Sequence, residues 1–530
     1  MSLQWLLSRS IPEDTVAIGR ALFAPTNVYR QLGDRFNDLF PEEVVFAPLY
    51  DPQGRGAIPP LLLALVTVFQ MLEKIPDRLA AEMVVSRIDW KYALHLPLTY
   101  AGFHWTVLTD FRQRLLEHEQ ERLLFDQLLQ HLVAQGLVKP RGKVRTDSTH
   151  VLGLVAMLSR LELVTESLRG AVRAVLELAP PWAEEALPDS FCERYAERTS
   201  DYRLGQTEAR RRFLQAGRDG FWFLGQVDHT APAQVPALRE VTVLRTVLQQ
   251  QFPEGDGRPP APTRPMGRQV IESPHEPEAR YATKRDRAWR GYKVQATETC
   301  DADRPHLILD LEPTSALAPD CPELPKIQER LEAQGTPPGE QYVDQGYMSG
   351  QRIQESADRD ITLMGLPLSG GHTVAGFQQT NFQIDLVAHQ ATCPAEETSA
   401  VWSERRRMVG QPPTIEIRFD GATCHACRFW GSCTSSRQGR SLELHAYHVL
   451  LTARRAEAQT DLFKEKMHLR AGVEGTISEL VRAHRLRYAR YRGQRKLRLQ
   501  ALFTAVAVNL KRLTRWWKQV GSPSESSATT

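Results

Sequence analysis

Three acidic residues of this 530-residue chain stand where carboxylates could do chemistry. Asp147 ends a short β-like run, KVRTD, and Asp344 ends a second one, EQYVD. Glu474 lies on a helical stretch at which a basic region begins. Neighbouring strands can bring two strand-end carboxylates together, and a helix packed on the sheet can add a third. Two Mg²⁺ ions about 4 Å apart, held by such oxygens, stabilise both reacting oxygens of a phosphodiester displacement.

Each of these acids also has an ordinary structural explanation. By spacing alone, Asp147 and Asp344 fit a turn-forming or helix-capping role equally well. Arg470 precedes Glu474 by four residues, so the two fit a salt bridge on the surface of a helix. Apolar residues beside the pair indicate that it lies at the edge of a buried face. The choice between chemistry and structure stays open at this point.

The charge of the chain is segregated, although its net value is only +3. Residues 464–518 contain fifteen Lys or Arg and three Glu, so the rest of the chain is net negative. Within this region, residues 480–500 interleave Tyr488 and Tyr491 with eight Lys or Arg. Basic side chains contact phosphate, and aromatic rings pack on sugar or base, so the segment predicts DNA binding. A solvated basic helix is the alternative.

Four of the seven cysteines form a second group of residues that could do chemistry. Cys424, Cys427 and Cys433 follow a C-x2-C-x5-C pattern, and Cys393 precedes them next to a proline. Four thiolates at the ends of two hairpins can hold structural Zn²⁺, with His425 as a spare ligand. Reduced thiols that pack a small β domain are the alternative. The odd number of cysteines favours a reducing compartment, and the apolar start is too short for a signal peptide.

Hydrophobic periodicity indicates the elements that position these groups. Helical spacing dominates residues 1–138, including a buried helix over 57–72 that is too short to cross a membrane. A hairpin over 291–314, a helix over 322–334 and strands before Asp344 and over 359–367 follow the order of an α/β layer. We therefore expect an α/β fold with flanking helices, an all-helical N-terminal domain and a small β-rich insertion. The expected parts are a helical domain, 1–138; the first part of the core, 139–367, with a helical insertion, 151–250, and a proline-rich linker, 251–277; a β-rich insertion, 368–450; basic C-terminal helices, 451–517; and a disordered tail, 518–530.

Four stretches together resemble the DDE transposases of bacterial insertion sequences, in the large subgroup with a helical N-terminal domain. They are KVRTDSTH, EARYATKRDRAWRGYKVQATETCD, YVDQGY and RAGVEGTISE, and they occur in the family's order. The resemblance covers the chain from about residue 20 to about residue 515. It implies an RNase-H-like mixed sheet in the catalytic core. It further implies that Asp147, Asp344 and Glu474 bind two Mg²⁺ or Mn²⁺ ions.

The spacing of Arg470 and Glu474 matches the family's signature around its catalytic Glu. Met467 and Val481 depart from it, because Tyr and Lys are common at these positions. Arg482 and Arg485 are the expected substitutes for contact with the DNA end. The full set of predicted DNA-contacting residues is Lys284, Arg285, Trp289, Arg470, Arg482, Arg485, Tyr488 and Arg490.

The resemblance implies a transposase that cuts at the ends of its element and joins the 3′-OH to target DNA. Its partners would be the terminal inverted repeats, target DNA and a second copy of the chain, in the bacterial cytoplasm at the nucleoid and not in a membrane. Two other functions fit the same residues. One is a decayed or domesticated protein that binds DNA without catalysis, and the other is a structure-specific nuclease of the same fold.

Overall fold

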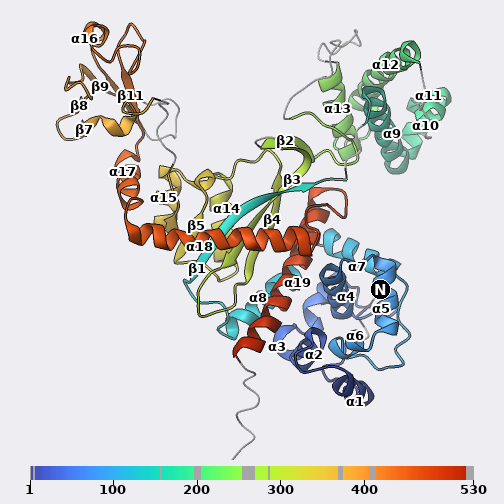
Figure 1. Ribbon diagram of the computed structural model, residues 1–530. Coiled ribbons are helices and arrows are strands. Elements are labelled where there is room, and N and C mark those ends of the chain that lie inside the picture. The colour runs from blue at the N-terminus through green and yellow to red at the C-terminus, as the bar shows by residue number, and fades with distance from the viewer. Residues whose placement is uncertain are drawn as a thin grey trace, which may run out of the picture. The chain divides into compact units, whose positions relative to one another are not determined.

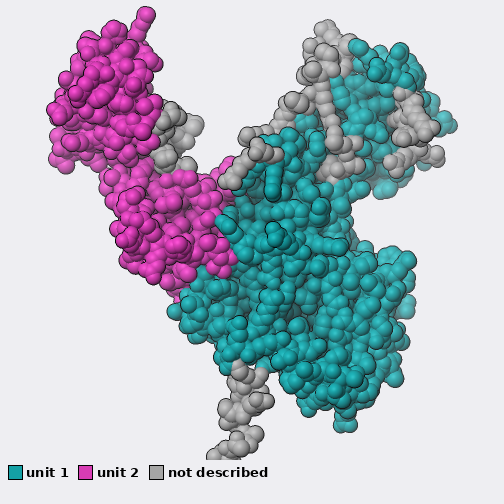
Figure 2. Space-filling view, in the orientation of Figure 1, with its two compact units in different colours: residues 1–139, 147–318, 474–530 teal, residues 140–146, 319–473 magenta. Residues whose placement is uncertain are grey.

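The computed structural model describes residues 2–3, 6–154, 158–195, 205–252, 269–284, 287–367, 374–405 and 413–520. The chain divides into two compact units (Figure 2). Unit 1 contains residues 1–139, 147–318 and 474–530, and unit 2 contains residues 140–146 and 319–473. Strand β1 (Lys143–Leu152) and helix α18 (Asp461–Ser478) each continue from one unit into the other. Asp147 and Glu474 therefore belong to unit 1, and Asp344 belongs to unit 2.

The N-terminal part of unit 1 is helical, as its periodicity predicts. Helix α4 begins at Pro60, where proline needs no hydrogen-bond donor, and ends where Lys74 adopts a left-handed φ of 62°. No helix among the described residues is long and apolar enough to cross a membrane. The elements are α1 (Glu13–Leu22), α2 (Val28–Asp34), α3 (Phe36–Leu39), η1 (Glu43–Leu49), α4 (Pro60–Glu73), α5 (Asp77–Ser86), α6 (Ile88–Ala93), α7 (Thr106–Glu117) and α8 (Leu123–Ala134).

The sheet of unit 1 combines the second part of β1 with β2 (Arg280–Lys284), β3 (Arg287–Thr299) and β4 (Ile308–Ser315). Strands β3 and β4 pair antiparallel, which confirms the predicted hairpin, and β2 adds an unpredicted strand antiparallel to β3. The register shifts between Thr297 and Glu298, as in a β-bulge. Gly291 lets β3 approach β1, because a Cβ at this position would collide with the backbone carbonyl of Val151.

In unit 2, the first part of β1 pairs parallel to β5 (Glu340–Val343), and β5 pairs parallel to β6 (Thr362–Met364). The expected helix is present as α14 (Glu323–Ala333), and α15 (Gly350–Ala357) connects β5 to β6. Parallel neighbours need such helical connections. The described core is thus mixed α/β, in agreement with the predicted class.

The chain contains two insertions, one in each unit, and each has its own set of helices or strands (Figure 1). The first is a helical bundle with its own apolar core, which begins at a capping box of Ser159 and Glu162. Its helices are α9 (Arg160–Leu178), α10 (Pro180–Ala186), α11 (Asp189–Tyr195), α12 (Gln206–Thr230) and α13 (Arg239–Gln251). Most of the proline-rich linker that we expected over 251–277 lies outside the described residues.

The second insertion is rich in β structure, as predicted. Its two small sheets pair β7 with β8, and β10 with both β9 and β11, all antiparallel. Its elements are η3 (Gln379–Asn381), β7 (Gln383–Asp385), β8 (Gln390–Thr392), β9 (Val401–Arg405), β10 (Thr414–Arg418), α16 (Gly421–Ala426) and β11 (Ser441–Leu444).

The C-terminal region is helical, as the sequence predicts. Helix α17 (His448–Glu457) precedes α18, which passes directly into a π-helical turn, η4 (Glu479–Ala483). Helix α19 (Gln494–Val520) is buried along much of its length and packs on β4 and on the N-terminal helices α2, α4 and α8. It continues three residues into the range predicted as a tail, and residues 521–530 lie outside the described residues.

Candidate active site

Asp147 lies in the middle of a strand and not at its end, which corrects the sequence-based placement. Strand β1 continues through Leu152, because Thr149 and Val151 maintain the alternation of buried and less buried positions beyond the aspartate. The side chain is partly buried, and its Oδ1 accepts a hydrogen bond of 2.7 Å from the backbone N–H of Ser148. A strand buried on one face thus holds the carboxylate.

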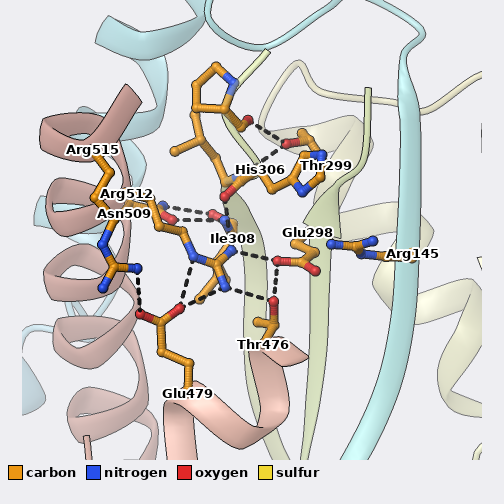
Figure 3. Close-up of polar contacts among 12 residues, drawn as sticks. Arg145, Glu298, Thr299, His306, Ile308, Thr476, Glu479, Asn509, Arg512 and Arg515 are labelled. Carbon is orange, nitrogen blue, oxygen red and sulfur yellow. Dashed lines mark hydrogen bonds and ion pairs between the residues drawn. The ribbon is translucent and has the colours of Figure 1, made fainter. Parts of the chain in front are cut away.

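Glu474 is exposed on α18, one turn before the helix changes to the π-helical η4. Short π-helical segments inside α-helices are frequent at functional sites. Two residues after Glu474, the Thr476 side chain is buried and begins a network of polar contacts (Figure 3). This network ties the end of α18 to the sheet and to α19.

Arg512 of α19 is the centre of that network. Its guanidinium donates to Glu298 Oε2 at 2.5 Å, to Thr476 Oγ1 at 2.7 Å and to the His306 carbonyl at 2.8 Å. It also donates twice to Glu479 Oε2, at 3.0 and 3.1 Å. Thr476 in turn donates to Glu298 at 2.5 Å. A guanidinium has five N–H donors, and this one meets four acceptor groups in a planar fork.

The strand side of the network begins at the β-bulge. Glu298 lies at the register shift, and its side chain is 1% exposed. Next to it, Asn509 of α19 accepts from the Ile308 N–H at 2.8 Å and donates to the Ile308 carbonyl at 2.9 Å (Figure 3). The bulge frees backbone groups that the side chain of α19 then satisfies.

Glu479 shows the electrostatic character of this cluster. Burial alone would raise the pKa of Glu479, but the charge and hydrogen bonds of Arg512, together with the nearby Lys511 and His484, hold that pKa below its ordinary value of 4.5. The carboxylate therefore stays ionised near neutral pH. None of this network was predicted from the sequence, because Glu298 and Arg512 are 214 positions apart.

Asp344 follows β5 directly, as predicted, and caps the short helix η2 (Gln345–Tyr347). Its Oδ1 accepts from the Gln345 N–H at 2.8 Å, and its side chain is half exposed. Arg470 of α18 lies 3.7 Å from the same carboxylate. Unit 2 thus brings together two of the predicted site residues, and Asp344 is one partner of Arg470.

The unit 2 part of α18 is fixed by further polar contacts. Lys466 lies 3.3 Å from Glu340 of β5, and Arg145 of β1 donates to the Leu469 carbonyl at 2.9 Å. Gly472 leaves room for the Arg145 guanidinium, since a Cβ there would collide with it. The sequence feature that corresponds to this contact is Gly472, the glycine two residues before Glu474 in RAGVEG.

Hard oxygen donors are the common feature of Asp147, Asp344 and Glu474, and this donor set fits Mg²⁺ or Mn²⁺. Among the described residues, however, no three His, Cys, Asp or Glu side chains already form a metal-binding group.

A cluster of positive charge lies near the end of β1 in unit 1. Burial, followed by the charges of Arg487, Arg287 and Lys284, lowers the pKa of His150 to about 4. Arg487 donates to the carbonyl of His150, and Arg287 lowers the pKa of Arg487 in addition to burial. Of these cations, only Lys284 was predicted. We call Lys284, Arg287 and Arg487 the basic cluster.

The basic segment is attached to β1 by backbone hydrogen bonds. The Leu152 N–H donates to the Arg487 carbonyl, and the Ala489 N–H donates to the Leu152 carbonyl, both at 2.8 Å. Tyr488 between them is 62% exposed. This pairing leaves an aromatic ring on the surface next to the basic cluster.

The other predicted DNA-contacting residues differ in their exposure. Arg482 and Arg485 are exposed, whereas Arg490 donates to the Ile75 carbonyl at 2.5 Å and so serves the packing of the N-terminal helices. Trp289 is only 6% exposed and packs in a small apolar cluster, so its ring has little surface to offer to DNA. Arg285 lies outside the described residues.

Two regions of the chain match family models. Residues 392–514 match a model described as transposase DDE domain, and residues 20–114 match a model described as transposase domain DUF772. The first match includes Arg470, Glu474 and the four cysteines, whereas Asp147 and Asp344 precede it. No curated protein and no solved structure matches the chain.

Proposed function

The chain belongs to the DDE transposases of insertion sequences, and on that premise we propose that it cuts DNA at the ends of its element and joins the freed 3′-OH to target DNA. Asp147, Asp344 and Glu474 are the proposed catalytic residues, on an RNase-H-like core. The terminal inverted repeats and target DNA are the proposed substrates. A homodimer would hold the two ends in one complex, and the bacterial nucleoid would be the site of action.

The three carboxylates are the proposed ligands of two Mg²⁺ or Mn²⁺ ions, which would stabilise negative charge on the reacting phosphate oxygens. The residues of the chain hold these carboxylates in place. Strand β1 carries Asp147, the turn after β5 carries Asp344, and the end of α18 carries Glu474. Arg470, at 3.7 Å from Asp344, supplies a positive charge that can orient a phosphate beside that carboxylate.

The basic cluster is the observation that carries this proposal. Its cations lie on three separate elements, β2, β3 and the segment after η4, and all of them act on His150, three residues along β1 from Asp147. Like charges repel one another when they gather, unless an anion neutralises them. A DNA phosphate is such an anion, and the exposed ring of Tyr488 adjoins the cluster to pack on sugar or base.

The test is cleavage of a duplex that carries the inverted repeats flanking the gene, with Mg²⁺ added. Asp147→Asn, Asp344→Asn and Glu474→Gln should each lower the cleavage rate by on the order of 10³-fold or more, because a catalytic metal supplies several kcal/mol. The matched control is Glu465→Gln, since Glu465 is exposed on the same helix as Glu474. Binding of the duplex in a gel-shift assay should be unchanged in all four variants.

The alternatives predict other outcomes of this experiment. A protein that binds DNA without catalysis would shift the duplex but leave it uncut at every Mg²⁺ concentration. A structure-specific nuclease would cut branched or nicked DNA as well as the repeats and would give no strand-transfer product. Cleavage at wild-type rate by any of the three carboxamide variants would contradict the assignment of that carboxylate.

A further inference from the structure

The β-rich insertion has a small apolar core. Among its described residues, six apolar side chains are buried in the core cluster: Phe382, Ala391, Ile417, Phe419, Leu442 and Leu444. A core of this size contributes little stability, and many small domains add disulfides or a structural metal. All seven cysteines of the chain are free thiols, so disulfides do not supply this constraint.

The four cysteines of this insertion face one pocket. Cys393 follows β8, Cys424 lies on α16, and Cys427 and Cys433 belong to the loop after α16. The rest of the lining is half apolar, including Phe419, and half polar or charged, including Glu397, Asp420 and Arg440. Three of the sulfurs, those of residues 393, 424 and 433, also pack against the apolar core.

Backbone N–H groups already point at three of the four sulfurs. The Ala395 N–H donates to Cys393 Sγ at 3.4 Å, and the Phe429 N–H donates to Cys427 Sγ at 3.4 Å. In both cases the donor lies two residues after the cysteine, so the two turns have the same local geometry. A metal-bound cysteine sulfur carries negative charge, and backbone N–H groups are its usual hydrogen-bond donors.

The third such bond comes from the other side of the pocket. The Arg440 N–H donates to Cys424 Sγ at 3.5 Å, and the Arg440 side chain also lines the pocket. Cys433 interacts electrostatically with each of the other three thiols, so the three lie close enough to act on its charge. The positive charge of Arg440 also acts on Cys433. A nearby cation of this kind compensates for accumulated thiolate charge.

We propose that Cys393, Cys424, Cys427 and Cys433 bind one structural Zn²⁺ ion that holds the β-rich insertion folded. Four thiolates satisfy the tetrahedral preference of zinc, at about 2.3 Å for each Zn–S bond. The thiol protons leave to solvent as the bonds form. The sulfurs line one pocket but do not already form a metal-binding group among the described residues, so zinc binding draws them closer together. His425 is not a ligand, since its ring packs on Trp430 at 4.7 Å between centroids.

The experiment measures metal in the full-length protein, purified without chelator, by elemental mass spectrometry. We expect about one zinc per chain and no iron. The double variant Cys424→Ser, Cys427→Ser should lose at least about 90% of the zinc, because two remaining thiolates bind it weakly. Cys321→Ser is the matched control, since Cys321 lies in the same unit but outside the pocket, and it should keep the full amount.

A second measurement on the wild-type protein does not depend on the folding of any variant. A zinc chelator should make residues 374–444 sensitive to limited proteolysis while the N-terminal helices stay protected. Added Zn²⁺ should restore resistance. Less than about 0.1 zinc per chain in the wild type, iron in place of zinc, or full zinc content in the double variant would each overturn the proposal.

Discussion

The surroundings of Glu474 and Asp344 differ in how they hold a carboxylate in place. Two residues after Glu474, the buried Thr476 joins Arg512 and Glu298 in a network that links helix, sheet and a second helix. Asp344 stands on a short turn, and its carboxylate lies 3.7 Å from the guanidinium of Arg470. One carboxylate thus depends on distant packing, and the other depends on local backbone and surface charge.

This difference separates two ways in which a mutation can remove activity. Near Glu474, a substitution that does not touch DNA should first cost stability, because a buried charge loses its partner. Near Asp344, a substitution should change chemistry with little effect on stability, since exposed ion pairs contribute little. Four substitutions separate the two cases by their effect on stability.

Arg512→Ala should have the largest effect. It removes the Arg512 cation from the buried Glu298 carboxylate, and breaking a buried ion pair in this way costs about 3 kcal/mol. Native-state hydrogen exchange at residues 474–483 should therefore become faster, and cleavage should fall with it. Arg515→Ala is the matched control on the same helix, because Arg515 is more than half exposed and lies 3.7 Å from Glu479. Equal exchange rates in the two variants would contradict the anchoring role.

Gly472→Ala should have the next largest effect. The new methyl group would displace the Arg145 guanidinium from its bond to the Leu469 carbonyl, at a cost of about 1 to 2 kcal/mol. Gly475→Ala is the control, since a Cβ there would meet nothing within 4 Å. Alanine favours a helix over glycine by about 1 kcal/mol, so this control should stabilise α18. Both variants gain this helix propensity, so equal shifts of the unfolding temperature in the two would refute the steric explanation.

Glu479→Gln should change the response to acid. The pKa of Glu479 is lower in the folded protein than its ordinary value of 4.5, so its ionisation stabilises the fold above about pH 4.5. That contribution is lost as the pH falls through the lowered pKa. Unfolding by urea at a series of pH values below 5 should show a shallower loss of stability in Glu479→Gln than in the wild type. The exposed Glu465→Gln should keep the wild-type slope.

The same contrast explains how much of the site the sequence could predict. Asp344 was placed correctly because a short apolar run ends at it and a glycine follows, which are local signals. Asp147 was placed at a strand end because Ser148 and Thr149 suggested a turn, whereas pairing with neighbouring strands extends β1 to Leu152. Element type could be predicted from periodicity, but the strand boundary depended on tertiary contacts.

Sequence patterns could not predict contacts between residues that are far apart in the chain. The contact between Glu298 and Arg512 depends on a β-bulge and on the docking of α19, and neither leaves a periodic signal. Arg287 faces Lys284 across the β2–β3 pair, and Arg487 joins them around His150 because the basic segment pairs with β1. The residue types were visible in the sequence, but their neighbours were not.

Arg470→Ala should have the smallest effect on stability and tests the other half of the contrast. Its ion pair with Asp344 is partly exposed, so its loss should cost less than about 1 kcal/mol. Lys466→Ala is the matched control on the same helix, because Lys466 forms a comparable ion pair with Glu340 at 3.3 Å. If Arg470 orients phosphate beside Asp344, cleavage should fall by at least about 10-fold in Arg470→Ala and stay near wild type in Lys466→Ala. Equal cleavage rates in the two variants would show that Arg470 forms a surface ion pair and does not orient phosphate. If Arg470→Ala lowered the free energy of unfolding by as much as Arg512→Ala, the two carboxylates would not differ in how they are held.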